Sequence, residues 1–363
     1  MYADDLVWPW WEALRVDCPL FDIHTHVGVN DPSGFSATAD DVRAALSRLD
    51  AGAAVFPLTE PDGYRDANDA VLKEAPLVPF CRVAPGDDPA GEARRCVEAG
   101  AAGIKLHPAS DGFELDDQEL TGVFGLAHEL RLPIVVHAGP ENDALGDTLL
   151  ALLDRYSGAR FVLAHDGLTD LAWLAGHPLP ATLFFDTSWW SPTDLVTLLG
   201  AVPPGRVLFG SDIPYSTPTW GAHATARCAM YAGLDDERLA SVLGGQSRRL
   251  VDRADPLDLG PAPGAVPPLD PLLERLYVYL AAAVEPTKRG EPLGQLLNLA
   301  RHCCRVRSGH PHRAVFESVR ELLDRYEQHA PHLTTGNQYA PGWDLVATAA
   351  IVARTPGTPL PDL

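Results

Sequence analysis

The sequence predicts an α/β protein, a (β/α)8 TIM barrel followed by a C-terminal helical appendage. Two observations lead to this fold class. Short apolar runs recur along the first 211 residues, and helical patterns fill most of the intervals between them. Short continuous apolar runs are typical of parallel strands that are buried on both faces, and eight strand–helix units can close into a barrel. An open, doubly wound parallel sheet is the alternative.

Eight runs qualify as strands, and their intervals suit one strand, a loop, a helix and a return loop. The helix expected at 40–49 has the strongest start signal, because Thr38 and Asp41 have the spacing of a capping box. The predicted strands are 20–24, 53–56, 77–81, 102–106, 133–137, 160–165, 182–186 and 206–211, and the clearest predicted helices are 40–49, 89–99, 116–130, 145–156 and 235–252.

We expect three segments along the chain. Its 363 residues exceed the size at which one core usually stops growing, so a barrel with an appendage is a natural division. Residues 1–252 form the predicted barrel domain, and the proline-rich stretch 253–271 reads as a semi-rigid linker. Residues 272–363 form the predicted helical appendage, with helical patterns at 272–284, 292–306 and 312–329 and a weaker one at 343–353.

The overall composition narrows the class of partner. A net charge of −21 argues against nucleic acid or an anionic membrane as a partner, and no apolar run is long enough to span a bilayer. The first residues lack the basic start and apolar run of a signal peptide, and the six cysteines show no CxxC spacing. We therefore expect a cytoplasmic protein with reduced cysteines and a small-molecule substrate, with a homo-oligomer left open.

Metal-binding side chains stand at the ends of several predicted strands. Residues two apart on a strand share a face, so His24 and His26 can both reach the mouth of the barrel. An HxH pair is a weak signal by itself, but functional residues of such barrels lie at the C-terminal ends of strands. The other candidates at strand ends are Lys105 in the fourth, His137 in the fifth, His165 in the sixth and Asp212 after the eighth.

At these positions the sequence resembles the amidohydrolase superfamily, and within it the amidohydrolase 2 branch of metal-dependent hydrolases and nonoxidative decarboxylases. Five ordered motifs carry the resemblance, which spans roughly residues 18–252. The matching segments are 22–28 (DIHTHVG), 103–108 (GIKLHP), 136–139 (VHAG), 163–167 (LAHDG) and 207–214 (VLFGSDIP).

The resemblance implies a set of ligands and catalytic groups. It makes His24, His26 and His137 ligands of a divalent metal, with Asp212 as the fourth ligand and as acceptor of a proton from the activated water. It makes His165 either part of a second metal site or a catalytic group that polarises the substrate. Nitrogen and carboxylate donors with an open position favour Zn²⁺, in one or two ions, although Mn²⁺ or Fe²⁺ also fits.

Lys105 has three interpretations. In two-metal members of the superfamily a strand-four lysine is carbamylated and bridges the ions, and Lys105 would hold that place. The alternatives are an unmodified lysine that binds substrate, and a structural ion pair. Only three lysines occur in the chain, Lys73, Lys105 and Lys288, which makes each of them notable where arginine is the usual basic residue.

Three further residues are candidates for substrate binding, and a fourth departs from the family pattern. His107 lies two residues beyond Lys105 and would crowd the site. Trp189 and Trp190 follow the seventh strand, where they would wall an apolar or aromatic substrate or pack against a loop or subunit. Asp166 stands where an apolar residue is usual, and we expect it to add negative charge near the mouth.

The sequence supports one leading function and two alternatives. The leading hypothesis is a metal-dependent hydrolase that uses metal-activated water on an amide, lactone or ester of a small molecule. The first alternative is a nonoxidative, metal-dependent decarboxylase, a carboxy-lyase of a small carboxylic acid, aromatic or not. The second is a catalytically silent, metal-binding scaffold, against which the full set of ligand positions argues.

Overall fold

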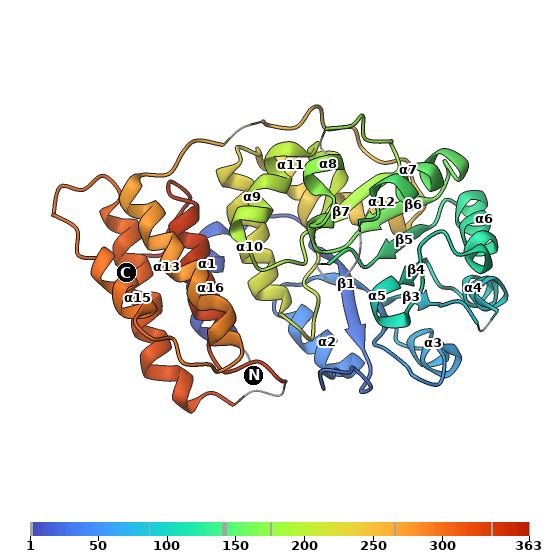
Figure 1. The fold of residues 1–363 in the computed structure, drawn as a ribbon, viewed down its shortest axis with the longest axis horizontal. Helices are drawn as coiled ribbons and strands as arrows, with labels where there is room; N and C mark the ends of the chain where they lie inside the picture. The colour runs from blue at the N-terminus through green and yellow to red at the C-terminus, as the bar shows by residue number, and fades with distance from the viewer. Residues whose placement is uncertain are drawn as a thin grey trace.

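A computed structural model describes residues 3–86, 88–139, 144–174, 176–264, 266–334 and 337–362. It contains one eight-stranded parallel sheet in which each strand pairs with its successor in the chain, from β1 to β8 (Figure 1). All eight predicted strands form. They are β1 (Phe21–Val27), β2 (Gly52–Pro57), β3 (Val78–Arg82), β4 (Gly103–Leu106), β5 (Pro133–Val136), β6 (Arg160–Leu163), β7 (Leu183–Asp186) and β8 (Val207–Leu208).

The sheet closes between β1 and the segment that follows β8. The backbone N–H of Ile23 donates to Phe209 O at 3.0 Å, that of Asp212 to His24 O at 2.9 Å, and that of His26 to Ile213 O at 2.9 Å. Thr25 and Ile213 form a parallel bridge. These bonds complete a (β/α)8 TIM barrel and confirm the predicted fold class, whereas the open doubly wound sheet is wrong.

Helices surround the barrel, and further helices form the appendage. Thr38 and Asp41 make the expected capping box at the start of α2. The α-helices are α1 (Asp4–Leu14), α2 (Ala39–Ser47), α3 (Arg65–Val71), α4 (Pro89–Glu98), α5 (Pro108–Asp111), α6 (Thr121–Leu130), α7 (Gly146–Arg155), α8 (Leu171–Leu174), α9 (Pro192–Ala201), α10 (Pro218–Tyr231), α11 (Asp236–Ala240), α12 (Gln246–Val251), α13 (Pro271–Lys288), α14 (Leu296–Cys303), α15 (Arg313–His329) and α16 (Trp343–Arg354). Shorter 3-10 turns are η1 (Gln118–Leu120), η2 (His165–Gly167), η3 (Pro204–Arg206) and η5 (Ala330–His332).

The predicted single helix at 235–252 is divided in three. A π-helical turn, η4 (Ser241–Gly245), separates α11 from α12 because Gly244 leaves the helical conformation. A Cβ at Gly244 would lie only 2.5 Å from Pro19 O and 2.6 Å from Phe21 N. Helical periodicity does not reveal this break, since its cause is the close approach of the chain at the start of β1.

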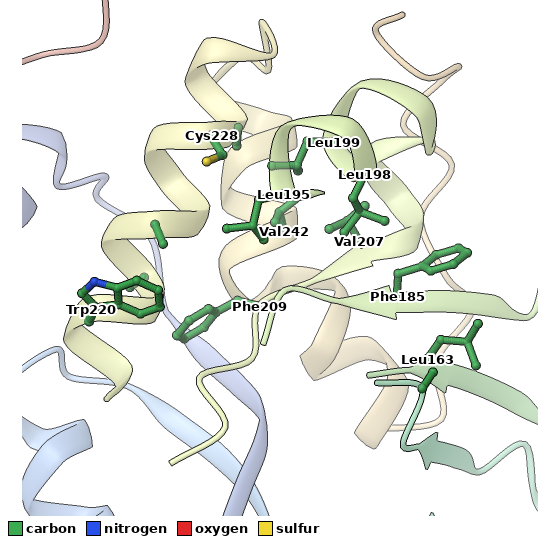
Figure 2. Close-up of a cluster of buried hydrophobic side chains, with 14 of the residues drawn as sticks. Leu163, Phe185, Leu195, Leu198, Leu199, Val207, Phe209, Trp220, Cys228 and Val242 are labelled. Atoms are coloured by element: carbon green, nitrogen blue, oxygen red, sulfur yellow. The ribbon is translucent and has the colours of Figure 1, made fainter. Parts of the chain in front are cut away.

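Alternate strand residues divide the apolar core into an outer and an inner part. The outer part packs the strands against the helices, and Figure 2 shows Phe209 facing Trp220 of α10 and Val207 beside Leu198 of α9. The inner part fills the barrel with Phe56, Phe80, Val135, Val162, Phe184 and Leu208, among others. This packed floor leaves only the mouth open to a ligand.

The appendage packs against one side of the barrel (Figure 1). Its central helix α16 is buried along nearly its whole length and contacts α13, α15, α10, α9 and α1. The buried Arg227 of α10 donates to Thr355 Oγ1 and Pro359 O, each at 2.8 Å. Helix α1 joins the same contact, since the indole N–H of Trp10 donates to Ser318 Oγ of α15 at 2.8 Å.

The proline-rich segment that precedes the appendage carries no helix or strand among its described residues. Its first part is fixed to the barrel by Gln246, whose amide nitrogen donates to Leu257 O at 3.2 Å and whose amide oxygen accepts from Leu257 N at 3.0 Å. In the described ranges, no helix is both long and apolar enough to cross a membrane.

Candidate metal centre

Three of the predicted ligands meet at the closure of the barrel. His24 and His26 come from β1, and Asp212 follows β8 directly beside them. The Nε2 atoms of the two histidines lie 3.2 Å apart, and each lies 3.2 Å from Asp212 Oδ1. Asp212 Oδ1 is buried and has no hydrogen-bond donor among the described residues. Two ring nitrogens and a carboxylate oxygen thus converge on one point.

His165 joins this group from the end of β6. The ligand atoms of His24, His165 and Asp212 all lie within 4.8 Å of one another. The Nδ1 atom of His165 lies 2.8 Å from Ser188 O, a carbonyl that only accepts, so Nδ1 carries the proton. The Nε2 atom therefore faces the site as a lone pair.

His137 and His107 lie one step further from β1. The Nδ1 atom of His137 lies 3.1 Å from His165 Nε2, and the rings of His137 and His107 stack with centroids 3.8 Å apart. The Nδ1 atom of His107 accepts a hydrogen bond from the backbone N–H of Ser110 at 3.2 Å. The structure thus brings His137 into contact with the group through His165, and His107 into contact with His137.

Strained backbone marks two of these positions. His165 has φ of 55° and Asp212 has φ of 58°, in the left-handed region that residues other than glycine rarely adopt. Such conformations cost free energy and tend to occur at functional sites, where the surrounding structure enforces them. Here they turn the side chains at the ends of β6 and β8 toward β1.

Asp186, at the end of β7, orients His24 and was not among the predicted site residues. Its Oδ2 accepts from His24 Nδ1 at 2.8 Å, and its Oδ1 accepts the backbone N–H groups of His165 and Ser188, each at 3.1 Å. A carboxylate on Nδ1 fixes the tautomer in which Nε2 offers a lone pair, as is common for metal-bound histidines. Its place at a strand end was the available signal, since the other candidates share it.

Burial sets the charge of these groups. It lowers the pKa of His24 to about 4 and that of His26 well below its usual range, with further lowering from the nearby Lys105 ammonium. Burial also raises the pKa of Asp212, against the opposing effect of the neighbouring histidines. Neutral imidazoles present lone pairs rather than protons, which is the state that ligates a metal.

Lys105 lies beneath this group and is fully buried. Its Nζ has no hydrogen-bond partner in the described part of the chain and lies 5.1 Å from the centre of the Phe56 ring. Burial and the Arg82 guanidinium lower the pKa of Lys105 to about 7. The missing partner counts against a structural ion pair and leaves the carbamate and the substrate-binding interpretations open.

The donor set fits a divalent cation. Neutral imidazole nitrogens with one carboxylate are the ligands of catalytic zinc, and the same set accepts manganese or iron. The buried Asp212 Oδ1, which lacks a donor, is the kind of atom that a bound cation satisfies.

Comparison with known proteins gives the family. An amidohydrolase family model matches residues 21–253. The chain belongs to the amidohydrolase family. No curated protein matches it significantly. Amidohydrolases are metal-dependent enzymes, so a metal centre at this mouth agrees with the family.

Solved structures agree with the barrel of this amidohydrolase. A crystal structure of an amidohydrolase II matches at 18% identity with a TM-score of 0.51, covering 64% of this chain and 99% of its own. The apo form of IDCase from Metarhizium anisopliae matches at 16% identity with a TM-score of 0.51, covering 65% and 97%. An amidohydrolase from Burkholderia multivorans matches at 15% identity with a TM-score of 0.51, covering 64% and 99%. At these identities they show the fold alone.

The amidohydrolase has a cavity of about 730 Å³ over the candidate metal centre. Trp189, Trp190 and His107, the three predicted substrate-binding residues, all line it. The indole N–H of Trp189 donates to Asp194 Oδ2 at 2.9 Å, which fixes that ring beside His165. This places an aromatic surface next to the candidate ligands.

Arg82, at the end of β3, also lines the cavity and was not predicted. Its side chain is buried, and its guanidinium donates to Asp111 Oδ2 at 3.2 Å and Oδ1 at 2.8 Å. The predicted third strand ends one residue earlier, at Cys81, so Arg82 stands at a strand end as the other candidates do.

The expectation for Asp166 is wrong. The side chain is completely buried, both carboxyl oxygens lack partners in the described ranges, and the residue does not line the cavity. Burial raises the pKa of Asp166 well above its usual range, with Asp194 and Asp186 adding to the effect. Asp166 therefore does not present its carboxyl group to the cavity.

Proposed function

We propose that this amidohydrolase is a metal-dependent hydrolase that acts with water on an amide, lactone or ester of a small molecule. The observation that carries the proposal is the meeting of His24, His26 and Asp212 at 3.2 Å, with His26 and Asp212 lining a cavity. His24, His26 and Asp212 would hold the metal, with His165 or His137 completing the set. A divalent ion there supplies Lewis acidity, which activates water and polarises a carbonyl.

Asp212 would move the proton. Its Oδ1 atom has no hydrogen-bond donor within the described residues, so the carboxylate can accept a proton from the attacking water. The same group then delivers that proton to the leaving alcohol or amine. His165 is held by Ser188 O through Nδ1, so its ring has a fixed orientation toward the reacting group.

The test is turnover of a panel of small lactones, amides and esters. We expect activity that chelation abolishes, and a decrease of at least about 100-fold in kcat for Asp212→Asn, because general acid–base groups contribute on that order. Asp154→Asn, on the exposed side of α7, is the matched control and should keep full activity. Full activity in Asp212→Asn would contradict the assigned role.

Nonoxidative decarboxylation of a small carboxylic acid is the second candidate. The aromatic wall supports it, because Trp189 lies with its ring centre 6.2 Å from that of His165 and also 6.2 Å from that of Trp190. A flat aromatic acid could stack there while His165 or Asp212 protonates the carbon that loses carbon dioxide. Release of carbon dioxide without incorporation of oxygen from ¹⁸O-labelled water would select this reaction over hydrolysis.

A further inference from the structure

One wall of the cavity comes from the appendage. Besides the barrel residues, Lys288, Arg289, Gln338, Tyr339 and Trp343 line it. All five lie beyond residue 253, where the match to the family model ends. Two hydrogen bonds join the appendage to the barrel here: Gln338 donates to Gly34 O at 3.1 Å, and Ser36 N donates to Asn337 Oδ1 at 3.0 Å. The appendage therefore adds chemistry that the barrel alone does not have.

Lys288, the last residue of α13, carries the main feature of this wall. Its Nζ lies 4.5 Å from the ring centre of Tyr339, 5.3 Å from that of Trp343 and 5.9 Å from that of Trp190. The residue is only 8% exposed. Aromatic faces stabilise an ammonium group and fix its position. Because Trp190 follows β7, this ammonium links the appendage to the substrate wall of the barrel.

Glu285 uses only part of the bonding capacity of this ammonium. It accepts from Lys288 Nζ at 3.1 Å, and its side chain is 39% exposed. An ammonium has three N–H donors, so Lys288 can bond to a further acceptor in the cavity. Arg289, with Nε 3.7 Å from the same carboxylate, adds a second positive charge to the wall.

Two polar side chains of the barrel at the same cavity also lack a hydrogen-bond acceptor. Ser216 and Trp220 line the cavity and are 8% and 3% exposed, yet Ser216 Oγ and Trp220 Nε1 have no hydrogen-bond partner within the described residues. Trp220 contacts Trp343, with ring centres 5.4 Å apart. Figure 2 shows its indole nitrogen on the side away from Phe209 and the apolar cluster. Buried donors without partners are unfavourable unless a ligand satisfies them.

We propose that Lys288, Ser216 and Trp220 form a distal subsite that binds a carboxylate of the substrate. A carboxylate only accepts hydrogen bonds, so it suits an ammonium, a hydroxyl and an indole N–H together. The substrate is then a carboxylic acid whose hydrolysable group lies over the metal centre and whose carboxylate lies against the appendage. This inference rests on the proposed function for the position of the reacting group.

Binding to the metal-loaded full-length protein tests the subsite without turnover. Calorimetric titration compares succinate, glutarate and adipate with butyrate, valerate and hexanoate, which have the same chain lengths but one carboxylate. We expect at least one dicarboxylate to bind 10-fold or more tightly than its partner, because the second carboxylate reaches the distal subsite. Equal affinity within every pair would overturn the proposal.

Lysine variants assign the preference to its residue. Lys288→Met should reduce the preference to less than twofold, whereas Lys73→Met, at an exposed lysine, should keep it in full. Ser216→Ala should weaken it several-fold and provides a second test if Lys288→Met does not fold. The proposal would be overturned if a folded Lys288→Met protein kept the complete preference. If only Ser216→Ala folds, the complete preference in that variant would overturn it. Full turnover in Asp212→Asn would instead contradict the proposed function, and it would not affect the evidence for the subsite.

Discussion

Asp186 shows how one carboxylate orients a residue of the candidate metal centre. It accepts from His24 Nδ1 and from two backbone N–H groups, so the ring of His24 has one orientation and one tautomer. Burial alone would raise the pKa of Asp186, but His24, His165 and Ser188 together hold it well below its usual range. It stays a carboxylate, and the lone pair of His24 Nε2 stays directed at Asp212.

Asp186→Asn should therefore weaken metal binding. An amide offers its nitrogen or a weaker acceptor to His24, so the histidine loses both basicity and its fixed tautomer. We expect a metal dissociation constant about 10- to 100-fold larger, the range typical of such supporting residues, with activity partly restored by added metal. Competition with a chromogenic chelator measures it. Unchanged affinity, with Asp154→Asn as the reference, would show that His24 does not depend on Asp186.

At the scale of single residues, the sequence identified the candidate ligands at the strand ends but not the residues that support them. His24, His26, His137, His165 and Asp212 occupy motif positions that spacing and resemblance identify. Asp186 and Arg82 stand at strand ends as the candidate ligands do, but neither lies in a motif that carries the family resemblance. Their roles arise from contacts across the barrel, which only the closed structure supplies.

Helix α1 and helix α16 meet through a buried acid. Asp344, in the first turn of α16, is 1% exposed and accepts the backbone N–H of Ala3 at 2.6 Å. Burial raises the pKa of Asp344 from 3.8 to about 7, and the nearby Asp4 adds to this. The folded chain thus keeps a proton that the unfolded chain releases above pH 4.

This difference makes stability fall as pH rises. The contribution of Asp344 is complete below its unfolded pKa near 4 and declines until pH reaches its folded pKa of about 7. The Asp344→Asn side chain cannot ionise. The variant should therefore melt roughly 2 to 4 °C above the parent at pH 8, whereas at pH 4.5 the two proteins should melt at nearly the same temperature. Calorimetric melting at both pH values measures it. A lower Tm for the variant at pH 8 would contradict the account.

At the scale of elements, periodicity predicted the strands and most helices, because each depends on its own residues. The break at Gly244 and the docking of α1 on α16 depend on distant segments and were not predicted. The wall that the appendage adds to the cavity also depends on distant segments, and it was not predicted. Lys288 stands at the end of α13, and the packing of α13 on α16 and of α16 on α10 brings it to the mouth of the barrel.

For the whole molecule, the metal should act as a stabilising ligand. Asp212 follows β8 and His24 lies on β1, so an ion between them ties the two ends of the sheet at the closure of the barrel. A ligand at 100 times its dissociation constant adds about 2.7 kcal/mol to the free energy of unfolding, which is worth a few degrees in Tm. We expect chelation to lower Tm by at least roughly 4 °C and added Zn²⁺ to restore it. Equal Tm before and after removal of bound metal would contradict this.

The central claim is that His24, His26 and Asp212 hold a catalytic metal, and metal content per chain tests it most directly. The measurement is mass-spectrometric metal analysis of protein never exposed to chelator, for the parent and for His24→Asn/His26→Asn. We predict at least one divalent ion per chain in the parent, and almost none in the folded double variant. Less than one ion in the parent, or equal content in both proteins, would contradict the account and favour the catalytically silent scaffold.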